Sequence, residues 1–359
     1  MLRSVVSIVL LGFFLHYAMK YRDWADFSRK IIPKVRPGQC QFARKEGGTE
    51  DLTYIGDGIF LASGGFEWEG DVGKILSINV SGDKSVMTPL AIRDAPNIDG
   101  FMVRNHGISA WRDPESGTLY LYVLTHPKPV TSSTDRVEVF EVVQKGLHLR
   151  YIRTIVDPSF TFMNDLVAVG RDQFYITRYN WFRSTWWIRF AHWFHIREGA
   201  ILFYDGQHVV RAVPDSYFLS NGINASPDRK TIYMAEWGTK TVHALKREEN
   251  NQLTTTWTEY VDSGVDNIEV DQETGDLWIG SHPVTHRIVD IFGWFGKLPA
   301  AQVLRIKIRD GVMTSLEEIY ADDGDELMAS TVAAYGAGKL VIGSVFKQTV
   351  VCDVNYLTE

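Results

Sequence analysis

An internal repeat runs through this chain and leaves few folds open to it. Six segments share one plan: a polar pair, an aliphatic residue, a short strand, a turn and a second apolar strand. Their aliphatic residues lie 56, 58, 57, 45 and 64 positions apart along the chain and are Leu52, Ile108, Leu166, Ile223, Ile268 and Val332. Long repeats that each carry several short strands are typical of a β-propeller. The sequence therefore predicts an all-β, six-bladed β-propeller.

The composition is that of an ordinary globular chain. Its 359 residues are 45% hydrophobic and 23% charged, which supplies ample apolar material for a core. The 37 basic residues against 44 acidic ones give a net charge of −7, and no Arg-rich stripe stands out. This balance argues against nucleic acid as a partner. Collagen-like, disordered, disulfide-dense and multi-span membrane classes are excluded as well.

The N-terminus carries one apolar run at residues 4–19, which basic and aromatic residues follow at 20–24. The run is shorter than the roughly 20 residues that a bilayer span requires, yet longer than the core of an ordinary signal peptide. The flanking residues are typical of an interfacial anchor. We favour an uncleaved signal-anchor over a cleaved signal peptide or a buried helix. We therefore expect an anchor helix at 1–24 and a folded region at 25–359.

The chain has two cysteines, Cys40 and Cys352, one near each end of the folded region. They are either unrelated buried thiols or one disulfide formed in an oxidising compartment. We favour the disulfide, because a propeller must close its ring and this bond would fasten the two ends. Asn79 and Asn224 begin glycosylation sequons. Together these features predict the secretory pathway, with the chain anchored in the endoplasmic reticulum or plasma membrane, or secreted if the anchor is released.

Each repeat places its polar pair at the entry to the strand that would line the tunnel of a propeller. The symmetry would bring these side chains to the axis: Glu50, Asp51, His106, Asn164, Asp165, Asn221, Asp266, Asn267, Ser330 and Thr331. Any single member is explained equally well by an Asx turn that caps a strand. As a set, carboxylates packed in a dry tunnel would repel one another unless a cation lay among them. Oxygen ligands without a thiolate favour calcium.

The motifs around these residues occur in a specific order: GTEDL at 48–52, NHGIS at 105–109, NDLVAVG at 164–170, NGIN at 221–224, VDNI at 265–268 and GSHP at 280–283. In order, spacing and cysteine placement they resemble the paraoxonases, the calcium-dependent arylesterase and lactonase family. The resemblance runs from the apolar N-terminus to Cys352. It implies a six-bladed propeller with two calcium ions in its tunnel, one catalytic and one structural.

The resemblance also assigns ligands to both ions. The structural calcium would be held by Asp51, Asp165 and the backbone carbonyl of Ile108. The catalytic calcium would be held by Glu50, Asn164, Asn221, Asp266 and Asn267. Every one of these residues is present in this chain.

The resemblance further implies a histidine dyad at His106 and His126. A calcium ion with an open face would polarise a lactone or ester carbonyl and stabilise the oxyanion that forms. His106, oriented by His126, would take a proton from the attacking water, because imidazole ordinarily titrates near neutral pH. Glu50 or Asp266 would be the alternative base, and the sequence does not choose between them.

One stretch of the expected pocket departs from the family. Paraoxonases usually carry an Asn-Asp-His-Tyr run after the strand that corresponds to QFYIT, whereas this chain has Arg-Tyr-Asn-Trp at 178–181. Tyr179 would line the pocket together with His282, which matches a histidine of the family's pocket wall. An acidic residue is lost and Arg178 is gained near the mouth. The change bears on substrate preference and turnover, but it leaves the calcium ligands intact.

Two aromatic stretches predict contact with a membrane. Residues 181–197 carry four Trp, three Phe and three Arg, a pattern that favours an amphipathic helix at a membrane interface over a core helix. Residues 292–295 form a smaller candidate. In paraoxonases an equivalent helix joins the N-terminal helix in a membrane- or lipoprotein-docking face, which implies that substrates arrive from lipid.

We expect a membrane-associated, calcium-dependent hydrolase of hydrophobic lactones and aryl esters. The alternative is a catalytically weak or inactive paraoxonase-like chaperone whose clients are membrane proteins such as ion channels, because invertebrate relatives assist channel assembly in the endoplasmic reticulum. A sugar-lactone hydrolase on a related propeller fits less well, because such enzymes usually lack an anchor. The natural substrate and the oligomeric state do not follow from the sequence.

Overall fold

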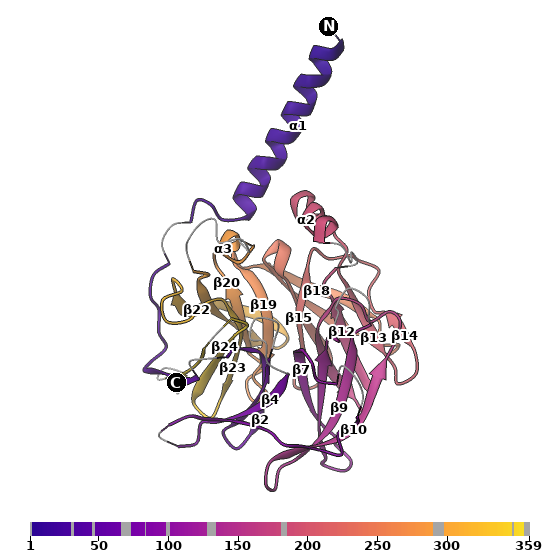
Figure 1. Ribbon diagram of the computed structural model, residues 1–359, viewed down its shortest axis with the longest axis vertical. Helices are drawn as coiled ribbons and strands as arrows, with labels where there is room; N and C mark the ends of the chain where they lie inside the picture. Colours follow the sequence, from indigo (N-terminus) through magenta and orange to yellow (C-terminus); the bar gives the residue numbers. More distant parts are fainter. Residues whose placement is uncertain are drawn as a thin grey trace.

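The computed structural model describes residues 2–29, 32–44, 47–65, 73–82, 84–97, 101–127, 134–180, 185–289, 298–346 and 348–354. Within these residues the strands form six mainly antiparallel sheets. The sheets stand around one axis as the blades of a propeller (Figure 1). The predicted six-bladed β-propeller is thereby confirmed for the part of the chain that is described.

The blades are built from the axis outward. The innermost strands are β2 (Thr49–Gly56), β7 (Asn105–Arg112), β11 (Met163–Gly170), β15 (Ser220–Ala225), β19 (Gly264–Val270) and β23 (Ser330–Gly336). The second strands are β3 (Ile59–Gly64), β8 (Leu119–Thr125), β12 (Gln173–Arg178), β16 (Thr231–Glu236), β20 (Leu277–His282) and β24 (Lys339–Ser344). These two rings of strands are the pairs that the sequence repeat predicts.

Two further rings complete the blades. The third strands are β4 (Lys74–Asn79), β9 (Arg136–Val143), β13 (Ala200–Tyr204), β17 (Thr241–Arg247), β21 (Ala301–Arg309) and β25 (Thr349–Asp353). The fourth strands are β5 (Val86–Pro89), β10 (His148–Val156), β14 (Val209–Arg211), β18 (Leu253–Tyr260), β22 (Val312–Asp322) and β1 (Cys40–Arg44). The second blade adds β6 (Ile92–Arg93), which pairs with β10 in parallel.

The ring closes through the last blade, which contains strands from both ends of the chain. β1 pairs antiparallel with β25, and Cys40 lies opposite Cys352 in this register. The two cysteines form a disulfide across 312 residues of sequence. The predicted bond is therefore present, and it fastens the fourth strand of the closing blade to the third.

The core lies between neighbouring blades, because the second strands bury both of their faces. In β12, Phe174 and Ile176 pack with side chains of the second blade, including Tyr122. Tyr175, which points the opposite way, packs on the fourth blade with Ile232. A strand that is buried on both faces needs a continuous apolar sequence, which is the reason for runs such as QFYIT.

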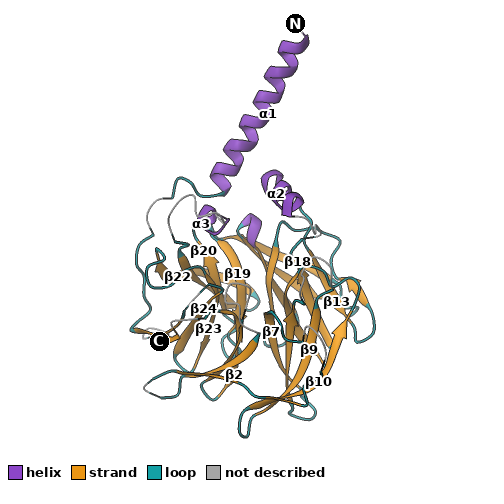
Figure 2. Cartoon of the chain, in the orientation of Figure 1, coloured by secondary structure: helices purple, strands orange, loops and turns teal. Residues whose placement is uncertain are grey.

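The helices gather at one end of the propeller (Figure 2). They are α1 (Leu2–Trp24), α2 (Thr185–Phe194), α3 (Thr285–Val289) and a 3₁₀ turn, η1 (Trp237–Thr239). In the described residues, α1 is the one helix long and apolar enough to cross a membrane, over Val5–Trp24, and that stretch has no buried residues. The boundary between an anchor at 1–24 and a propeller at 25–359 stays a prediction.

The aromatic helix is shorter than the sequence predicts. It spans Thr185–Phe194, whereas the predicted helix covered 181–197; residues 181–184 lie outside the described residues, as does the second aromatic candidate at 292–295. Rings of α2 stack on rings of α1: Trp193 lies 4.8 Å from Tyr21, and Phe194 lies 5.0 Å from Tyr17, between ring centroids. The two helices therefore form one aromatic face above the propeller.

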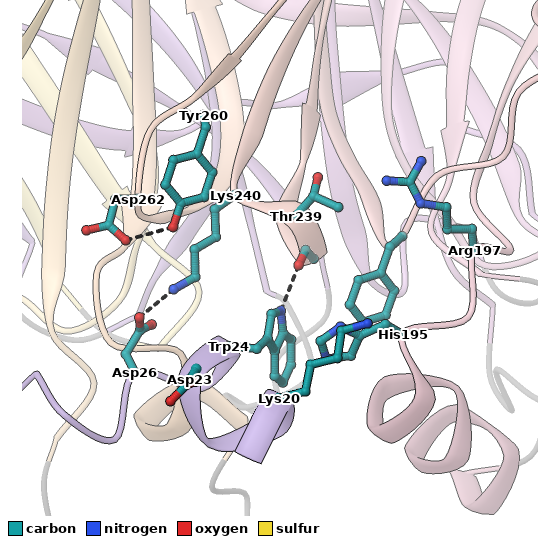
Figure 3. A pocket seen from close by; sticks show the side chains of 12 residues that line it. Lys20, Asp23, Trp24, Asp26, His195, Arg197, Thr239, Lys240, Tyr260 and Asp262 are labelled. Carbon is teal, nitrogen blue, oxygen red and sulfur yellow. Dashed lines mark hydrogen bonds and ion pairs between the residues drawn. The ribbon is translucent and has the colours of Figure 1, made fainter. Parts of the chain in front are cut away.

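The foot of α1 is fixed to the propeller at a cavity of about 500 Å³ (Figure 3). Trp24 Nε1 donates a hydrogen bond of 2.7 Å to the carbonyl of Gly238. Asp26 forms a buried ion pair of 2.5 Å with Lys240, and its second oxygen accepts hydrogen bonds from the backbone and hydroxyl of Thr285. These contacts hold the end of α1 against η1 and α3.

Candidate functional site

The polar pairs of three blades meet at the axis around Glu50. The side-chain amide of Asn267 donates to Glu50 Oε1 at 3.0 Å and to its backbone carbonyl at 3.1 Å. Thr331 Oγ1 donates to the same carbonyl at 2.8 Å. Residues far apart in the sequence therefore lie side by side, because each innermost strand contacts the next around the ring.

Two aspartates join neighbouring blades at the next level of the tunnel. Asp51 accepts hydrogen bonds from the backbone N–H of Leu52 at 2.8 Å and from that of Ile108, on the next blade, at 2.7 Å. Asp165 repeats the arrangement with Leu166 and with Ile223, each at 2.7 Å. The aspartate of the repeat thus binds the aliphatic position of the following blade.

Two glycines permit this close approach. A Cβ added to Gly107 would lie 2.2 Å from Asp165 Oδ1. A Cβ added to Gly222, at the same position of its repeat, would lie 2.5 Å from the Cα of Asn267. Both glycines directly precede the aliphatic residue of their repeat, so the motif needs a residue without a side chain there.

The tunnel carboxylates disfavour one another's charge. Burial, together with the charges of Glu50 and Glu269, raises the pKa of Asp51 well above its usual range. Burial and the charge of Asp51 likewise raise the pKa of Asp165. For Asp266, burial and then the charge of Glu50 raise the pKa. A cation among these groups would remove the repulsion that the raised values express.

The residues assigned to the catalytic calcium present oxygens that no described donor reaches. These buried atoms are Glu50 Oε2 and the side-chain carbonyl oxygens of Asn164, Asn221 and Asn267. A buried acceptor without a donor is costly, and hard oxygens of this kind are the ligands that calcium prefers. The residues present therefore fit the ion. Among the described residues no three His, Cys, Asp or Glu groups form a metal cluster, because three of these five ligands are amides.

The two predicted histidines are in contact beside the carboxylate cluster. His106 Nδ1 lies 2.8 Å from His126 Nε2. His106 Nε2 lies 3.2 Å from Glu50 Oε1. His126 in turn contacts Asp135, with 2.8 Å between Nδ1 and Oδ1. Sequence reasoning missed Asp135, since its only signal was an acidic residue nine positions after His126.

The wall opposite the histidine pair is formed by His282. Its Nε2 lies 3.5 Å from Asp266 Oδ2, while Nδ1 accepts a hydrogen bond of 3.0 Å from Trp237 Nε1. Burial lowers the pKa of His282 to about 3. The ring is therefore neutral, and because Nδ1 accepts, its proton is on the Nε2 that faces Asp266. Trp237, which also packs on Trp24 of α1, was not predicted.

The Arg178–Trp181 run divides between the pocket and the blade. Burial, and then the charge of Asp266, raise the pKa of Tyr179, so this phenol does face the site. Arg178 does not lie at the mouth as predicted. Its guanidinium is buried, and the charged groups that act on it are Arg211 and Glu198 of the third blade. The reason is strand alternation, which turns adjacent side chains to opposite faces.

The two sequons occupy different surroundings. Asn79 is exposed at the end of β4. Asn224 lies on β15, where its amide nitrogen donates to the carbonyl of Ile268 at 3.0 Å and to Glu269 Oε1 at 2.8 Å. A glycan needs that same nitrogen, so the geometry argues against Asn224 as an acceptor, whereas Asn79 stays a prediction.

Comparison with known proteins agrees with this geometry. Residues 34–354 match the family model named Arylesterase. The chain belongs to this family. It is 31% identical to serum paraoxonase/arylesterase 1 of Rattus norvegicus, with 98% of each chain covered. It is 29% identical to serum paraoxonase/lactonase 3 of Homo sapiens, with 98% of this chain and 99% of the human one covered.

A solved structure shows the same fold outside the arylesterase family. A luciferin-regenerating enzyme superposes with a TM-score of 0.52 at 12% sequence identity, covering 89% of this chain and 96% of the other. At this identity the likeness is one of fold. The site residues of the arylesterase family member described here must therefore be argued from its own geometry.

Proposed function

We propose that this chain is a calcium-dependent hydrolase of hydrophobic lactones and aryl esters. Membership of the arylesterase family supports hydrolase function. The observation that carries the finer proposal is the surroundings of Glu50. One of its oxygens contacts His106, and the other, like the oxygens of three asparagines beside the axis, is buried without a donor.

The proposed catalytic ion would be held by the carboxylates of Glu50 and Asp266 and by the amide oxygens of Asn164, Asn221 and Asn267. A second, structural ion would be held by Asp51 and Asp165. When bound in the first site, calcium supplies Lewis-acid polarisation of a carbonyl and charge for the oxyanion.

The chain's own groups supply the proton transfer. His106 Nε2 takes a proton from water while the water oxygen bonds to the carbonyl carbon of the ester or lactone. The C–O bond to the leaving oxygen then breaks, and His106 returns the proton to that oxygen. Hydrolysis of a lactone by this route gives one hydroxy acid, and hydrolysis of an aryl ester gives an acid and a phenol. His126, in contact with Nδ1, holds the ring in place.

We also propose that α1 anchors the protein in a membrane of the secretory pathway. The apolar helix and the disulfide are compatible with that compartment. Trp186 and Trp187 of α2 are 64% and 46% exposed, as expected for rings that enter the lipid interface. Hydrophobic substrates would then arrive from the lipid side, near the end of the propeller where the helices gather.

The accessory function remains as a second proposal because of the same exposed aromatic face, which offers a surface to a membrane-protein client. Tyr179 adds to it, because it places a phenol beside Asp266 where the family usually carries an acidic residue. A folded, calcium-loaded chain that hydrolyses no lactone or ester would favour this function over the first.

The test combines activity with metal content. Full-length protein in detergent is offered lactones and aryl esters of increasing chain length, with calcium or with EDTA, and bound calcium is measured directly. The variants Asn164→Leu and Asn221→Leu remove one amide oxygen each, and we expect both to lose bound calcium and turnover. Asn224→Leu, on the same strand as Asn221 but with its amide engaged by Glu269, is the control that should retain both. Equal calcium content in all variants would contradict the proposal.

A further inference from the structure

Four side chains stand in line from the tunnel into the second blade. The contacts run from Glu50 Oε1 to His106 Nε2 at 3.2 Å, from His106 Nδ1 to His126 Nε2 at 2.8 Å, and from His126 Nδ1 to Asp135 Oδ1 at 2.8 Å. The side chains of His126 and Asp135 are 7% and 4% exposed. Water therefore competes little for the two inner hydrogen bonds.

Asp135 is held from a second direction. Its other oxygen, Oδ2, accepts the backbone N–H of Met163 at 2.8 Å, and its own N–H donates to the carbonyl of Phe160 at 2.8 Å. Met163 directly precedes Asn164, one of the residues assigned to the catalytic calcium. Asp135 thus joins the histidine pair to the strand that carries a proposed ligand.

Proton counting along this line has one consistent solution for two neutral imidazoles. A carboxylate can only accept, so Nδ1 of His126 must carry the proton. Nε2 of His126 is then bare and accepts, so Nδ1 of His106 must donate to it. Nε2 of His106 is therefore left with a lone pair that faces the tunnel beside Glu50.

We infer that Asp135 is a positioning residue, which fixes the tautomers of both histidines so that His106 presents a basic nitrogen to the attacking water. The inference rests on the proposed hydrolysis for its role in turnover, while the tautomers themselves are a property of the folded chain. Asp135 touches neither substrate nor metal. A carboxylate that orients a catalytic imidazole in this way has a large effect on rate in other hydrolases.

The decisive variant is Asp135→Asn, because an amide offers one oxygen where two donors need acceptors. If that oxygen serves the N–H of Met163, the NH₂ group faces His126 Nδ1 and reverses both tautomers. His106 would then direct an N–H into the tunnel. We expect kcat to fall about 10²- to 10⁴-fold with little change in KM. Glu138→Gln is the matched control, because Glu138 is a fully buried carboxylate on β9 that bonds Thr154 and lies outside the line.

Nitrogen NMR of the full chain with ¹⁵N-labelled histidine reads the tautomers without any turnover. His106→Gln and His126→Gln identify the two signals. We expect protonated Nδ1 in both rings of the wild type and of Glu138→Gln, and a reversal in Asp135→Asn. Protonated Nε2 in the wild type would overturn the inference even if Asp135→Asn failed to fold. So would a variant with unchanged kcat and unchanged tautomers.

The two proposals fail in different ways. A wild type that hydrolyses nothing would end the proposed function, and the nitrogen spectra would still decide the role of Asp135. An active wild type with an equally active Asp135→Asn would leave the function standing and remove Asp135 from it.

Discussion

The carboxylate of Asp51 accepts the backbone N–H of Ile108 at 2.7 Å and so ties the innermost strands of the first two blades together at the axis. Asp165 and Ile223 repeat the contact two blades further on. The same carboxylates are the residues assigned to a structural calcium. One residue type therefore serves the architecture and the proposed metal site, and the two are expected to fail together.

The first prediction concerns pH and calcium. Folding raises the pKa of Asp51 and Asp165 above the ordinary value of 3.8, so the folded state binds these protons more tightly than the unfolded chain. Their contribution to stability is complete below that value and is lost as the pH rises through the raised pKa values. In EDTA the melting temperature should fall as the pH rises above about 4, and calcium should reverse the fall at neutral pH.

Variants separate this effect from the titration of other groups. Asp51→Asn and Asp165→Asn should flatten the pH dependence in EDTA, while Asp113→Asn, at an exposed turn, should not. Identical melting curves with and without calcium at every pH would show that no ion relieves the buried charges.

The second prediction concerns the close approach at Gly107. The Cβ of Gly107→Ala would meet Asp165 Oδ1 at 2.2 Å, so the innermost strands must move apart. Overpacking of this kind costs about 1–3 kcal/mol in the free energy of unfolding, measured by urea denaturation. Gly82→Ala is the control, because the nearest atom to its added Cβ lies 3.8 Å away. Equal stabilities would mean that the tunnel accommodates the methyl group.

The third prediction concerns the docking of α1. The Asp26–Lys240 pair is buried, and removing one partner leaves the other charge uncompensated, at a cost of about 3–5 kcal/mol to the docked segment. Lys240→Met should therefore expose the end of α1 to limited proteolysis. Lys34→Met breaks the exposed pair with Glu326, worth about 0–1 kcal/mol, and should leave the cleavage rate unchanged. Slow cleavage of both variants would place the anchoring energy in Trp24 and the aromatic contacts instead.

The fourth prediction concerns closure of the ring. The Cys40–Cys352 disulfide constrains 312 residues of the unfolded chain. In the chain-entropy model a loop of this size contributes up to about 5 kcal/mol, so the double variant Cys40→Ser/Cys352→Ser should unfold at a clearly lower urea concentration. An unchanged midpoint would mean that strand pairing between β1 and β25 closes the ring unaided.

The repeat in the sequence was sufficient to predict the blades and the residues that meet at the axis, because symmetry places equivalent positions together. It was not sufficient for side chains that support the site from outside the repeated position. Asp135 precedes a third strand and Trp237 lies in a turn, and neither position recurs from blade to blade. Only the folded chain shows that they orient His126 and His282.

The Arg178–Trp181 run shows a different limit. The sequence identified the departure from the family, but not which side chains face the pocket. The face that each residue of a strand presents changes at every position, so Tyr179 faces the site while Arg178 is buried in its blade. Substrate preference therefore depends on Tyr179, whose phenol stands beside Asp266.

Hydrolysis of a hydrophobic lactone by the full-length protein in detergent, measured with calcium and after chelation, tests the central claim most directly. We predict turnover that EDTA abolishes, that added calcium restores, and that Asn221→Leu lacks. A folded protein that retains its calcium and hydrolyses no lactone or aryl ester would contradict the account.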